Sequence, residues 1–532
     1  MPKSKFIFVT GGVTSSLGKG IIASSLGNLF QSRGYKTTII KLDPYLNVDP
    51  GTLNPYEHGE CYVTDDGSET DLDLGHYERF LNISTSHLNN VTSGAIYQRV
   101  IEKERNGDFL GKTIQVIPHI TDEIKNRISS LEKEEKFKII IVEIGGTVGD
   151  IESLPYIEAL RQFKFERKKD VCVIHLTLLP YLSSSGELKT KPTQHSVKTM
   201  LQSGVQPDII VCRSKISIEE KVKDKIALFC NVEKESVIEA LDADTIYKVP
   251  LMMLEQKLDL VVANKIGLKK IDNIDNGLWL KRIKKLKSSK KLFNVGIIGK
   301  YVELKDSYIS IHESLVHASA YLGFQLNIHW IQSDEINSQN VKRKIDNCDG
   351  IIVAPGFGSR GIDGKLTAVK YIRNNKIPFM GICLGMQVAV IEFARNVCGL
   401  KNAHSTEIDS KTKFPVINIM ANQHGVTKMG GTMRLGGYSC KLKLNTKAYD
   451  IYKKEIIFER HRHRYELNND FRKILSEKGM VFSGINDELD LVEMIEIKNH
   501  PWFIGVQFHP EYKSKFVKPH PLFISFVKSL NK

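Results

Sequence analysis

Three residue types in the C-terminal part of the sequence could together cleave an amide bond. Cys383 stands in GICLGMQ, between the apolar run IPFM and the segment VAVIEFARNV, whose apolar residues recur with a helical period. A turn from strand to helix holds its side chain out at the edge of a sheet, and flanking glycines permit a strained backbone there. This pattern presents a nucleophile, and a buried structural thiol is the alternative interpretation.

A catalytic cysteine needs a partner, because a thiol with a pKa near 8.5 is only about 3% thiolate at pH 7. The segment NHPWFIGVQFHPE places His509 at the end of an apolar strand and Glu511 two residues later, on the same face of an extended chain. The acid can orient the imidazole, which takes up the thiol proton and later returns it to a leaving amine. The sequence therefore predicts a triad of Cys383, His509 and Glu511.

A glycine-rich stretch, VTGGVTSSLGKGI from Val9 to Ile21, follows an apolar strand and precedes a helical pattern. Backbone N–H groups at such a helix start point together at an anion, and Lys19 adds a positive charge. The spacing departs from the standard P-loop, because Gly18 follows Gly12 by six positions rather than five and Gly20 replaces the magnesium-binding Ser or Thr. We interpret the stretch as a phosphate-binding loop, with a mere tight turn as the alternative.

Because this loop lacks a hydroxyl ligand for Mg²⁺, carboxylate oxygens must come from elsewhere. TDLDLGHYERF supplies Asp71 and Asp73, while IIIVEIGGTVGDIES contains Glu143 at a strand end, followed by Asp150 and Glu152. Ligands bind at the ends of strands in doubly wound sheets, and a buried acid is costly without a partner. We therefore expect a metal near these acids, although each one taken singly is more often a surface residue.

Lys189 and Lys191 lie two residues apart in GELKTKPTQHSVK. Two such ammonium groups repel each other unless an anion lies between them or water screens them. A second phosphate-bearing ligand and simple solvent exposure therefore both stay open.

The elements that would position these residues follow a repeating pattern. From Lys5 to about Leu260, apolar strand-like runs alternate with longer helical or irregular stretches, and the same rhythm begins again at Phe293. This predicts the α/β class, with two doubly wound domains. Between them KRIKKLKSSKK carries seven basic residues in eleven, which is typical of a solvated helix face or linker. We place an N-terminal domain at 1–268, a basic linker at 269–291 and a C-terminal domain at 292–532.

The composition of the 532 residues, 41% hydrophobic and 26% charged, is ordinary for a globular protein. The net charge of +14 comes from lysines spread along the chain without a recognised nucleic-acid module, so nucleotide phosphates are the expected anions. No apolar run approaches the roughly 18 to 20 residues of a membrane span, and no signal peptide is evident. Eight cysteines without a C-x-x-C pair argue against a zinc site or a disulfide framework. We expect a cytoplasmic protein that binds neither nucleic acid nor membrane.

Long stretches resemble the CTP synthase family almost from end to end. They are VTGGVTSSLGKG, KLDPYLNVDPGT, TDLDLGHYERF, VEIGGTVGDIESLP, GELKTKPTQHSV, GICLGMQVAV, ERHRHRYE and QFHPE. The resemblance implies a P-loop-type amidoligase in the first half, a class I glutamine amidotransferase in the second, and the amination of UTP to CTP in de novo pyrimidine nucleotide synthesis. ATP, Mg²⁺ and nitrogen from glutamine or ammonia would take part. It also implies activation by GTP, feedback inhibition by CTP, and a homotetramer that can form filaments.

The resemblance further implies which residues meet each ligand. For ATP they are Ser16, Leu17, Gly18, Lys19, Gly20, Ile21, Asp73 and Asp242, with Lys19 also catalytic and with Asp73 and Glu143 on Mg²⁺. For UTP or CTP they are Ser15, Asp150, Ile151, Glu152, Lys189, Thr190, Lys191, Pro192, Thr193, Gln194 and Lys225. For glutamine they are Gly356, Leu384, Gly385, Met386, Gln387, Glu407 and Arg464, with Cys383, His509 and Glu511 performing the hydrolysis.

Two segments depart from the family pattern. The family loop normally reads Pro-Gly-Gly-Phe-Gly, and here it is APGFG, Ala354 to Gly358. On an ungapped reading Pro355 replaces the first glycine and has no N–H for an oxyanion, while Gly356 and Leu384 keep theirs. Losing one such donor typically costs about 3 to 4 kcal/mol, or about 100- to 1000-fold in rate, so we expect glutamine-driven turnover to be weak relative to ammonia-driven turnover.

The second departure is the segment ANQHGVTKMGGTMRLGG, which is shorter than usual. Arg360 is a candidate effector contact.

Two other interpretations stay open. Another glutamine amidoligase, of the dethiobiotin or cobyric acid type, would share a modified phosphate loop, although KTKPTQHSV argues against it. A nucleotide-binding assembly protein with a decayed amidotransferase half would explain the altered glycine loop, although the retained Cys383, His509 and Glu511 argue against decay.

Overall fold

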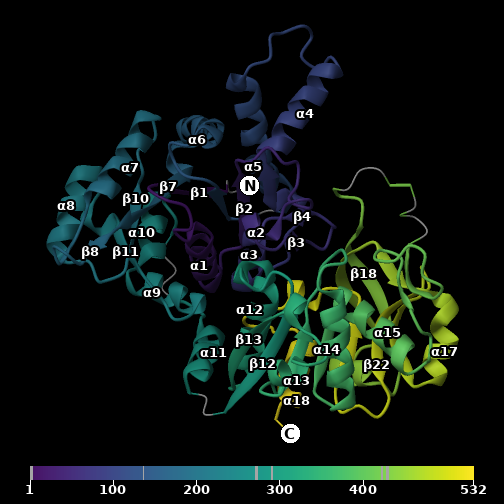
Figure 1. Cartoon of the computed structure of the whole chain (residues 1–532). Helices are drawn as coiled ribbons and strands as arrows, with labels where there is room; N and C mark the ends of the chain where they lie inside the picture. The colour runs from purple at the N-terminus through teal and green to yellow at the C-terminus, as the bar shows by residue number, and fades with distance from the viewer. Residues whose placement is uncertain are drawn as a thin grey trace. The chain divides into compact units, whose positions relative to one another are not determined.

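The computed structural model describes residues 4–135, 137–269, 273–288, 291–420, 423, 425–426 and 430–531. They form two compact units: unit 1 comprises Met1–Asp49 and His76–Leu278, and unit 2 comprises Pro50–Gly75 and Trp279–Lys532 (Figure 1). The segment Pro50–Gly75 thus folds with unit 2, although the sequence analysis assigned it to the N-terminal domain. Parts of the predicted basic linker (270–272, 289–290) and of the segment thought to be shortened (421–422, 424, 427–429) lie outside the described residues.

Unit 1 is built on a parallel sheet with the strand order β11-β10-β7-β1-β6-β2-β5. Its strands are β1 (Lys5–Gly11), β2 (Thr37–Asp43), β5 (Asn90–Thr92), β6 (Ile139–Ile144), β7 (Val171–Leu179), β10 (Ile209–Ser214) and β11 (Val237–Leu241), beside a hairpin of β8 (Tyr181–Leu182) and β9 (Glu187–Leu188). Its helices are α1 (Lys19–Ser32), α4 (Ser93–Arg105), α5 (Thr121–Glu135), α6 (Leu154–Arg167), α7 (Lys191–Gln202), α8 (Glu220–Cys230), α9 (Val249–Glu255) and α10 (Leu258–Lys265). Helix α3 (Asp73–Leu81) begins in unit 2 and ends in unit 1.

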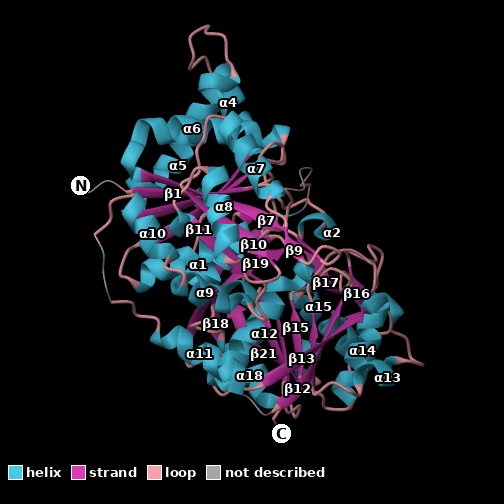
Figure 2. Ribbon diagram, turned by 90° about the vertical axis from the view of Figure 1, so that its left-hand side faces the viewer, coloured by secondary structure: helices cyan, strands magenta, loops and turns pink. Residues whose placement is uncertain are grey.

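The strands of unit 1 are apolar on both faces because helices cover both faces. On β1, Phe6 and Phe8 enter one buried cluster with residues of α4, α5 and α6, while Ile7 and Val9 are buried on the other side. Helices α1, α9 and α10 pack against one another on that other side (Figure 2). Parallel strands with helices on both faces are what the alternating sequence pattern predicted.

Unit 2 has a mixed sheet with the strand order β13-β12-β14-β15-β23-β22-β21-β18-β19 and a small sheet of β16, β17 and β20. Its strands are β3 (Tyr62–Val63), β4 (Glu69–Thr70), β12 (Leu292–Gly299), β13 (Gln325–Gln332), β14 (Gly350–Val353), β15 (Phe379–Ile382), β16 (His404–Ser405), β17 (Pro415–Ile419), β18 (Arg434–Leu442), β19 (Ile456–His463), β20 (Tyr465–Leu467), β21 (Met480–Asn486), β22 (Leu491–Ile497) and β23 (Phe503–Val506). Its helices are α2 (Pro55–His58), α11 (Gly277–Ser288, which starts just before the unit boundary), α12 (Ile309–Leu322), α13 (Val341–Ile345), α14 (Ile362–Asn374), α15 (Leu384–Asn396), α16 (Lys447–Tyr452), α17 (Arg472–Glu477) and α18 (Pro521–Ser529).

The sheet of unit 2 is parallel from β13 to β23 and antiparallel from β22 onward. Buried clusters lie on both of its faces, one with α13, α14 and α15 and the other with α12, α16 and α18. The predicted α/β class is confirmed for both units, whereas the antiparallel half of this sheet was not predicted. No helix among the described residues is both long and apolar enough to cross a bilayer.

Candidate functional site

Cys383 occupies the turn between β15 and α15 in unit 2. Its backbone has φ 51° and ψ -104°, a conformation that is strained for a residue with a Cβ. The flanking glycines are needed for space: a Cβ on Gly381 would lie 2.7 Å from the Gly385 backbone, and a Cβ on Gly385 would lie 2.2 Å from the Val353 oxygen. The strain therefore falls on the cysteine itself, and the glycines let the neighbouring strands and helix approach closely enough to hold it.

His509 and Glu511 form a buried pair beside this turn, with His509 Nδ1 2.7 Å from Glu511 Oε1. Glu511 lies in the short 3-10 turn Pro510–Lys513 rather than in the extended chain expected from the spacing. Burial opposes a charge on the imidazole, but the Glu511 carboxylate and the nearby Cys383 outweigh it and raise the pKa of His509 to about 10. Cys383 is near enough to His509 to contribute to this raised pKa, but His509 Nε2 makes no hydrogen bond within the described residues. This nitrogen is therefore open to a substrate.

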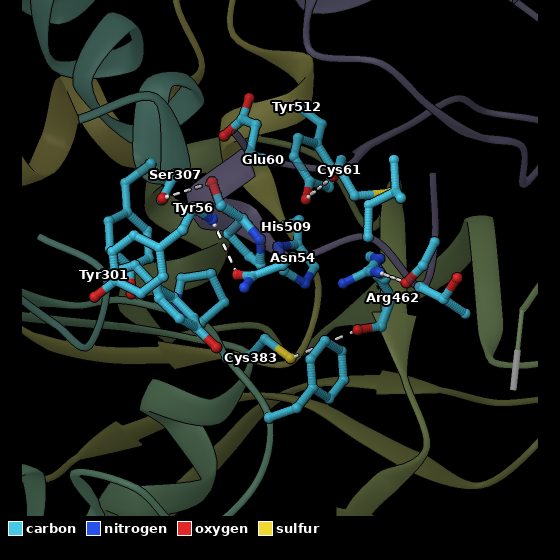
Figure 3. A pocket seen from close by; sticks show the side chains of 18 of the residues that line it. Asn54, Tyr56, Glu60, Cys61, Tyr301, Ser307, Cys383, Arg462, His509 and Tyr512 are labelled. Carbon is cyan, nitrogen blue, oxygen red and sulfur yellow. Dashed lines mark hydrogen bonds between the residues drawn. The ribbon is translucent and has the colours of Figure 1, made fainter. Parts of the chain in front are cut away.

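A cavity of about 540 Å³ opens onto Cys383 and His509 (Figure 3). Part of its lining comes from the loop Pro355, Gly356 and Phe357 and part from the segment Pro50–Gly75. The residues of that segment are Gly51, Thr52, Leu53, Asn54, Pro55, Tyr56, Glu60 and Cys61. The volume falls within the usual range for small-molecule sites and suits an amino acid.

Two buried lysines hold the APGFG loop. Lys365 Nζ donates to the Ala354 oxygen at 2.9 Å, and Lys300 Nζ donates to the Phe357 oxygen. Gly358, with φ 75°, adopts a left-handed conformation that glycine tolerates. The loop is thus anchored at two carbonyl groups, and its N–H groups are left to other partners.

Two N–H groups beside Cys383 are candidates to stabilise an oxyanion. Within the described residues, neither the Gly356 N–H nor the Leu384 N–H donates to a protein acceptor. Leu384 is the first residue of α15, where helical N–H groups have no partner within the helix. The arrangement can therefore supply two donors even though Pro355 supplies none.

Glu407, Gln387 and Arg464, which were also predicted for glutamine, form hydrogen bonds with neighbouring residues. Glu407 Oε1 accepts from the Gly358 N–H at 2.6 Å, and burial raises the pKa of Glu407. Gln387 Nε2 donates to the Tyr465 oxygen at 2.8 Å, and Arg464 donates to Thr432 Oγ1 at 2.8 Å. Gly385 and Met386 complete the first turn of α15, where Met386 is fully buried. Among the residues predicted for glutamine, the cavity lining includes Gly356.

Sequence reasoning missed two residues that touch Cys383. Gln507 Nε2 donates to Cys383 Sγ at 3.6 Å, and the Cys383 thiol donates weakly to the Arg462 oxygen at 3.9 Å. The Arg462 side chain pairs with Glu69 at 2.8 Å and lies over the Phe357 ring at 5.1 Å. Both residues belong to quoted motifs, QFHPE and ERHRHRYE, but neither motif reveals which member faces the cysteine.

The phosphate-loop candidate in unit 1 runs from the end of β1 to the start of α1. Val13, Ser16 and Gly18 have positive φ values of 79°, 58° and 91°, so the backbone coils tightly before the helix. Ser15 and Ser16 are exposed, whereas Leu17 and Gly20 are buried. Lys19 Nζ donates to the Gly146 oxygen at 2.8 Å, which keeps the ammonium group beside the loop. Open N–H groups at a helix start together with a lysine suit a phosphate.

An apolar hollow adjoins this loop in unit 1. It is lined by Gly18, Ile21, Ile22, Arg213, Ala240, Leu241, Ala243, Ile246, Val249, Met252 and Met253. The Arg213 guanidinium pairs with Asp242 at 2.6 Å, which places this predicted residue at the rim. Arg213 was missed because it is marked only by its place at a strand end, in PDIIVCRS.

Glu143, predicted as a metal ligand, is buried but partnered. Its carboxylate accepts from Lys41 Nζ at 3.0 Å and from the Tyr77 hydroxyl. These contacts explain its burial without a metal, and no group of three or more His, Cys, Asp or Glu in the described part of the chain could hold one. Asp73 is the first residue of α3 and belongs to unit 2. Carboxylate oxygens are nevertheless the ligands that suit Mg²⁺, so the donor chemistry fits.

The residues predicted for UTP or CTP lie around the loop, the start of α7 and α8. Asp150 accepts from the Thr147 N–H at 3.1 Å and precedes the 3-10 turn Ile151–Ser153, which contains Ile151 and Glu152. Lys189 forms an ion pair with Glu187, and this negative charge offsets part of the expected repulsion between Lys189 and Lys191. Thr190 directly precedes α7, whose first turn contains Lys191, Pro192, Thr193 and Gln194, while Lys225 lies on α8.

Two protein families match the chain. Residues 5–268 match the model described as CTP synthase N-terminus, and residues 303–529 match glutamine amidotransferase class-I. The CTP synthase of Flavobacterium johnsoniae is 58% identical over 99% of this chain and 98% of its own length. Those of Christiangramia forsetii and Clostridium acetobutylicum are 59% and 56% identical, each over 99% of this chain and 97% and 98% of their own lengths. The resemblance noted from the motifs is confirmed, and the chain belongs to the CTP synthase family.

Proposed function

We propose that this chain makes CTP from UTP, with ATP and with nitrogen taken from glutamine. The observation that carries the proposal is the buried His509–Glu511 pair beside the strained Cys383, in a chain that also has a phosphate-type loop before α1. A nucleophilic centre and a nucleotide centre together are what such a reaction requires.

In the glutamine half, His509 takes the proton of the Cys383 thiol, and the thiolate attacks the side-chain amide carbon of glutamine. The N–H groups of Gly356 and Leu384 stabilise the oxyanion that forms. His509 then gives its proton to the departing ammonia, and water releases glutamate from the sulfur. Glu511 keeps the imidazole oriented through Nδ1 during both transfers.

In the nucleotide half, the 4-oxygen of UTP is a poor leaving group until ATP phosphorylates it. Ammonia then attacks the ring carbon and phosphate leaves, giving CTP, ADP and phosphate. Lys19 would offset the negative charge on the transferring phosphoryl group. Glu143 and Asp73 would hold Mg²⁺, which neutralises phosphate charge when it is bound. The residues of the loop, the start of α7 and Lys225 would contact the two nucleotides.

The regulation and assembly of the family extend the proposal. We propose GTP as an activator, CTP as a feedback inhibitor and a homotetramer as the working form. Arg360, which donates to the Lys300 oxygen at 2.6 Å and stacks over Tyr301 at 5.0 Å, is a candidate effector contact beside the cavity. The cytoplasmic location and the domain limits at 268 and 292 stay predictions.

The test is CTP formation from UTP, ATP and Mg²⁺, with either glutamine or ammonium as nitrogen source. Cys383→Ala should abolish the glutamine-driven reaction and leave the ammonium-driven one intact. Loss of both reactions would contradict the division of labour between two sites. A product other than CTP would favour another glutamine amidoligase. If the protein binds nucleotides tightly but forms no product, an assembly protein would be favoured.

A further inference from the structure

A buried histidine joins the strand that leads into the phosphate loop to helix α7. His175 on β7 is fully buried, with Nδ1 2.8 Å from Thr10 Oγ1 and Nε2 2.8 Å from Ser196 Oγ. Thr10 lies near the end of β1, directly before the loop, and Ser196 lies on α7. The imidazole therefore spans from the strand that carries the proposed ATP loop to the helix whose first turn carries proposed UTP contacts.

The loop itself rests on the same pair of side chains. A Cβ added to Gly12 would lie 1.8 Å from Ser196 Oγ and 3.1 Å from His175 Nε2. The Gly12 N–H is fixed from the other direction, because it donates to the Leu176 oxygen at 3.0 Å. A side chain at position 12 would therefore collide with Ser196 and come close to His175, so the loop lies in close contact with these two side chains at Gly12.

His175 acts as a neutral group. Burial, and then the nearby Lys19, lower the pKa of His175 to about 3, so one ring nitrogen donates and the other accepts. Thr10 Oγ1 also lies 3.3 Å from the Ile174 carbonyl oxygen. Because a carbonyl oxygen only accepts, the Thr10 hydroxyl uses its one proton in that bond. Thr10 then accepts from Nδ1–H, and Nε2 accepts from the Ser196 hydroxyl. A neutral ring adds no charge for phosphate binding, so its effect on the reaction is geometric.

We propose that His175 is a positioning residue that fixes the phosphate loop against α7 and thereby aligns ATP with the UTP oxygen that it phosphorylates. This inference rests on the proposed function. Phosphoryl transfer depends on positioning, and a displacement of about 1 Å typically costs on the order of 100-fold in rate. A residue that aligns two bound nucleotides should therefore affect kcat more than either KM.

The first experiment measures ammonium-driven CTP synthesis by the full chain with matched variants. Ser196→Ala and Thr10→Val each remove one hydroxyl partner, Thr10→Ser keeps it, and Ser236→Ala removes a buried hydroxyl that has no partner in the described structure. We expect Ser196→Ala and Thr10→Val to lower kcat roughly 10- to 100-fold with both nucleotide KM values within about threefold. Thr10→Ser and Ser236→Ala should stay near wild type, and glutamine hydrolysis should be unchanged in all four.

A double-mutant cycle tests the contact directly. Gly12→Ala forces its Cβ against Ser196 Oγ, and Ser196→Ala removes that oxygen. The fold-loss in kcat caused by Gly12→Ala should therefore be at least about tenfold smaller in the Ser196→Ala background than in the wild-type background. Additive losses, an unchanged kcat in Ser196→Ala, or losses confined to KM would overturn the positioning role. A wild-type protein that makes no CTP would overturn the proposed function as well, whereas a wild type that makes CTP with an unaffected Ser196→Ala would overturn this inference alone.

Discussion

Lys365 Nζ lies 2.9 Å from the carbonyl oxygen of Ala354, and within the described residues this is its one hydrogen-bond acceptor. The side chain is fully buried at the first turn of α14, and no carboxylate in the described part of the chain forms an ion pair with it. An ammonium group has three donors, so two of them have no acceptor here. Burial first, and then the charge of Lys300, lower the pKa of Lys365 to about 7.

This burial predicts that Lys365 destabilises the fold at neutral and acidic pH. The unfolded chain keeps the proton up to the ordinary pKa of 10.5, while the folded chain releases it near 7. The unfolded state therefore binds more protons between these values, and stability should rise with pH across that window. Lys365→Met should raise the melting temperature at pH 7 by several degrees, for about 1 to 3 kcal/mol, and should flatten the rise toward pH 10.

Differential scanning calorimetry from pH 6 to 10 measures this effect. Lys370→Met, an exposed position on the same helix, is the matched control and should leave both the melting temperature and its pH dependence unchanged. A Lys365→Met protein that melts lower than wild type at pH 7 would contradict the prediction.

The His509–Glu511 pair predicts a defect limited to glutamine. Glu511→Gln removes the carboxylate, one of the two groups that raise the pKa of His509, so the pKa falls relative to wild type and the imidazole holds its proton less readily. We expect glutamine-driven kcat/KM to fall about 10- to 100-fold while ammonium-driven turnover stays within twofold of wild type. The pH profile of glutamine hydrolysis should also shift. Equal losses with both nitrogen sources would argue against a role confined to the imidazole.

The turn at Cys383 predicts a steric requirement at Gly381. In Gly381→Ala the new Cβ would lie 2.7 Å from the Gly385 backbone. Because the clash is with backbone atoms, no side-chain movement can relieve it. We expect a loss of about 1 to 3 kcal/mol in the unfolding of unit 2 and a loss of glutamine hydrolysis greater than tenfold. Gly277→Ala, where no atom of the described residues lies within 4 Å of the new Cβ, should be neutral in both assays. Comparable effects of the two substitutions would show that the contact does not matter.

The fold could be predicted from the sequence because its signals are local. Each parallel strand of unit 1 is a continuous apolar run, and the phosphate-type loop carries its glycines at the start of α1. The antiparallel strands of unit 2 were not predicted, because their pairing depends on partners distant in sequence. The placement of Pro50–Gly75 with unit 2 has the same origin: pairs such as Arg460 with Asp65 at 2.6 Å join segments that no spacing rule connects.

The same contrast holds for the site. Cys383, His509 and Glu511 were predicted because their residue types and flanking strands have a mechanism attached to them. Gln507 and Lys365 were missed, since a buried glutamine or lysine leaves no periodic signal. The unexpected partners of Glu143, Lys41 and Tyr77, come from another strand and a helix. Side-chain satisfaction of this kind depends on tertiary packing and becomes visible only in the fold.

Pro355 decides how strongly the altered loop limits glutamine use. Gly356 in the loop and Leu384 at the start of α15 retain their N–H groups, but the peptide nitrogen at Pro355 cannot donate. We expect Pro355→Gly to raise glutamine-driven kcat/KM about tenfold or more and to leave ammonium-driven kcat/KM unchanged, with NH₃ counted as the substrate. Steady-state kinetics with each nitrogen source measure both values, and Pro378→Gly, at the residue before β15 and outside the cavity lining, serves as a control for general loosening of the backbone. If wild-type kcat/KM values for glutamine and NH₃ are already comparable, the two remaining donors suffice and the missing one has no catalytic consequence.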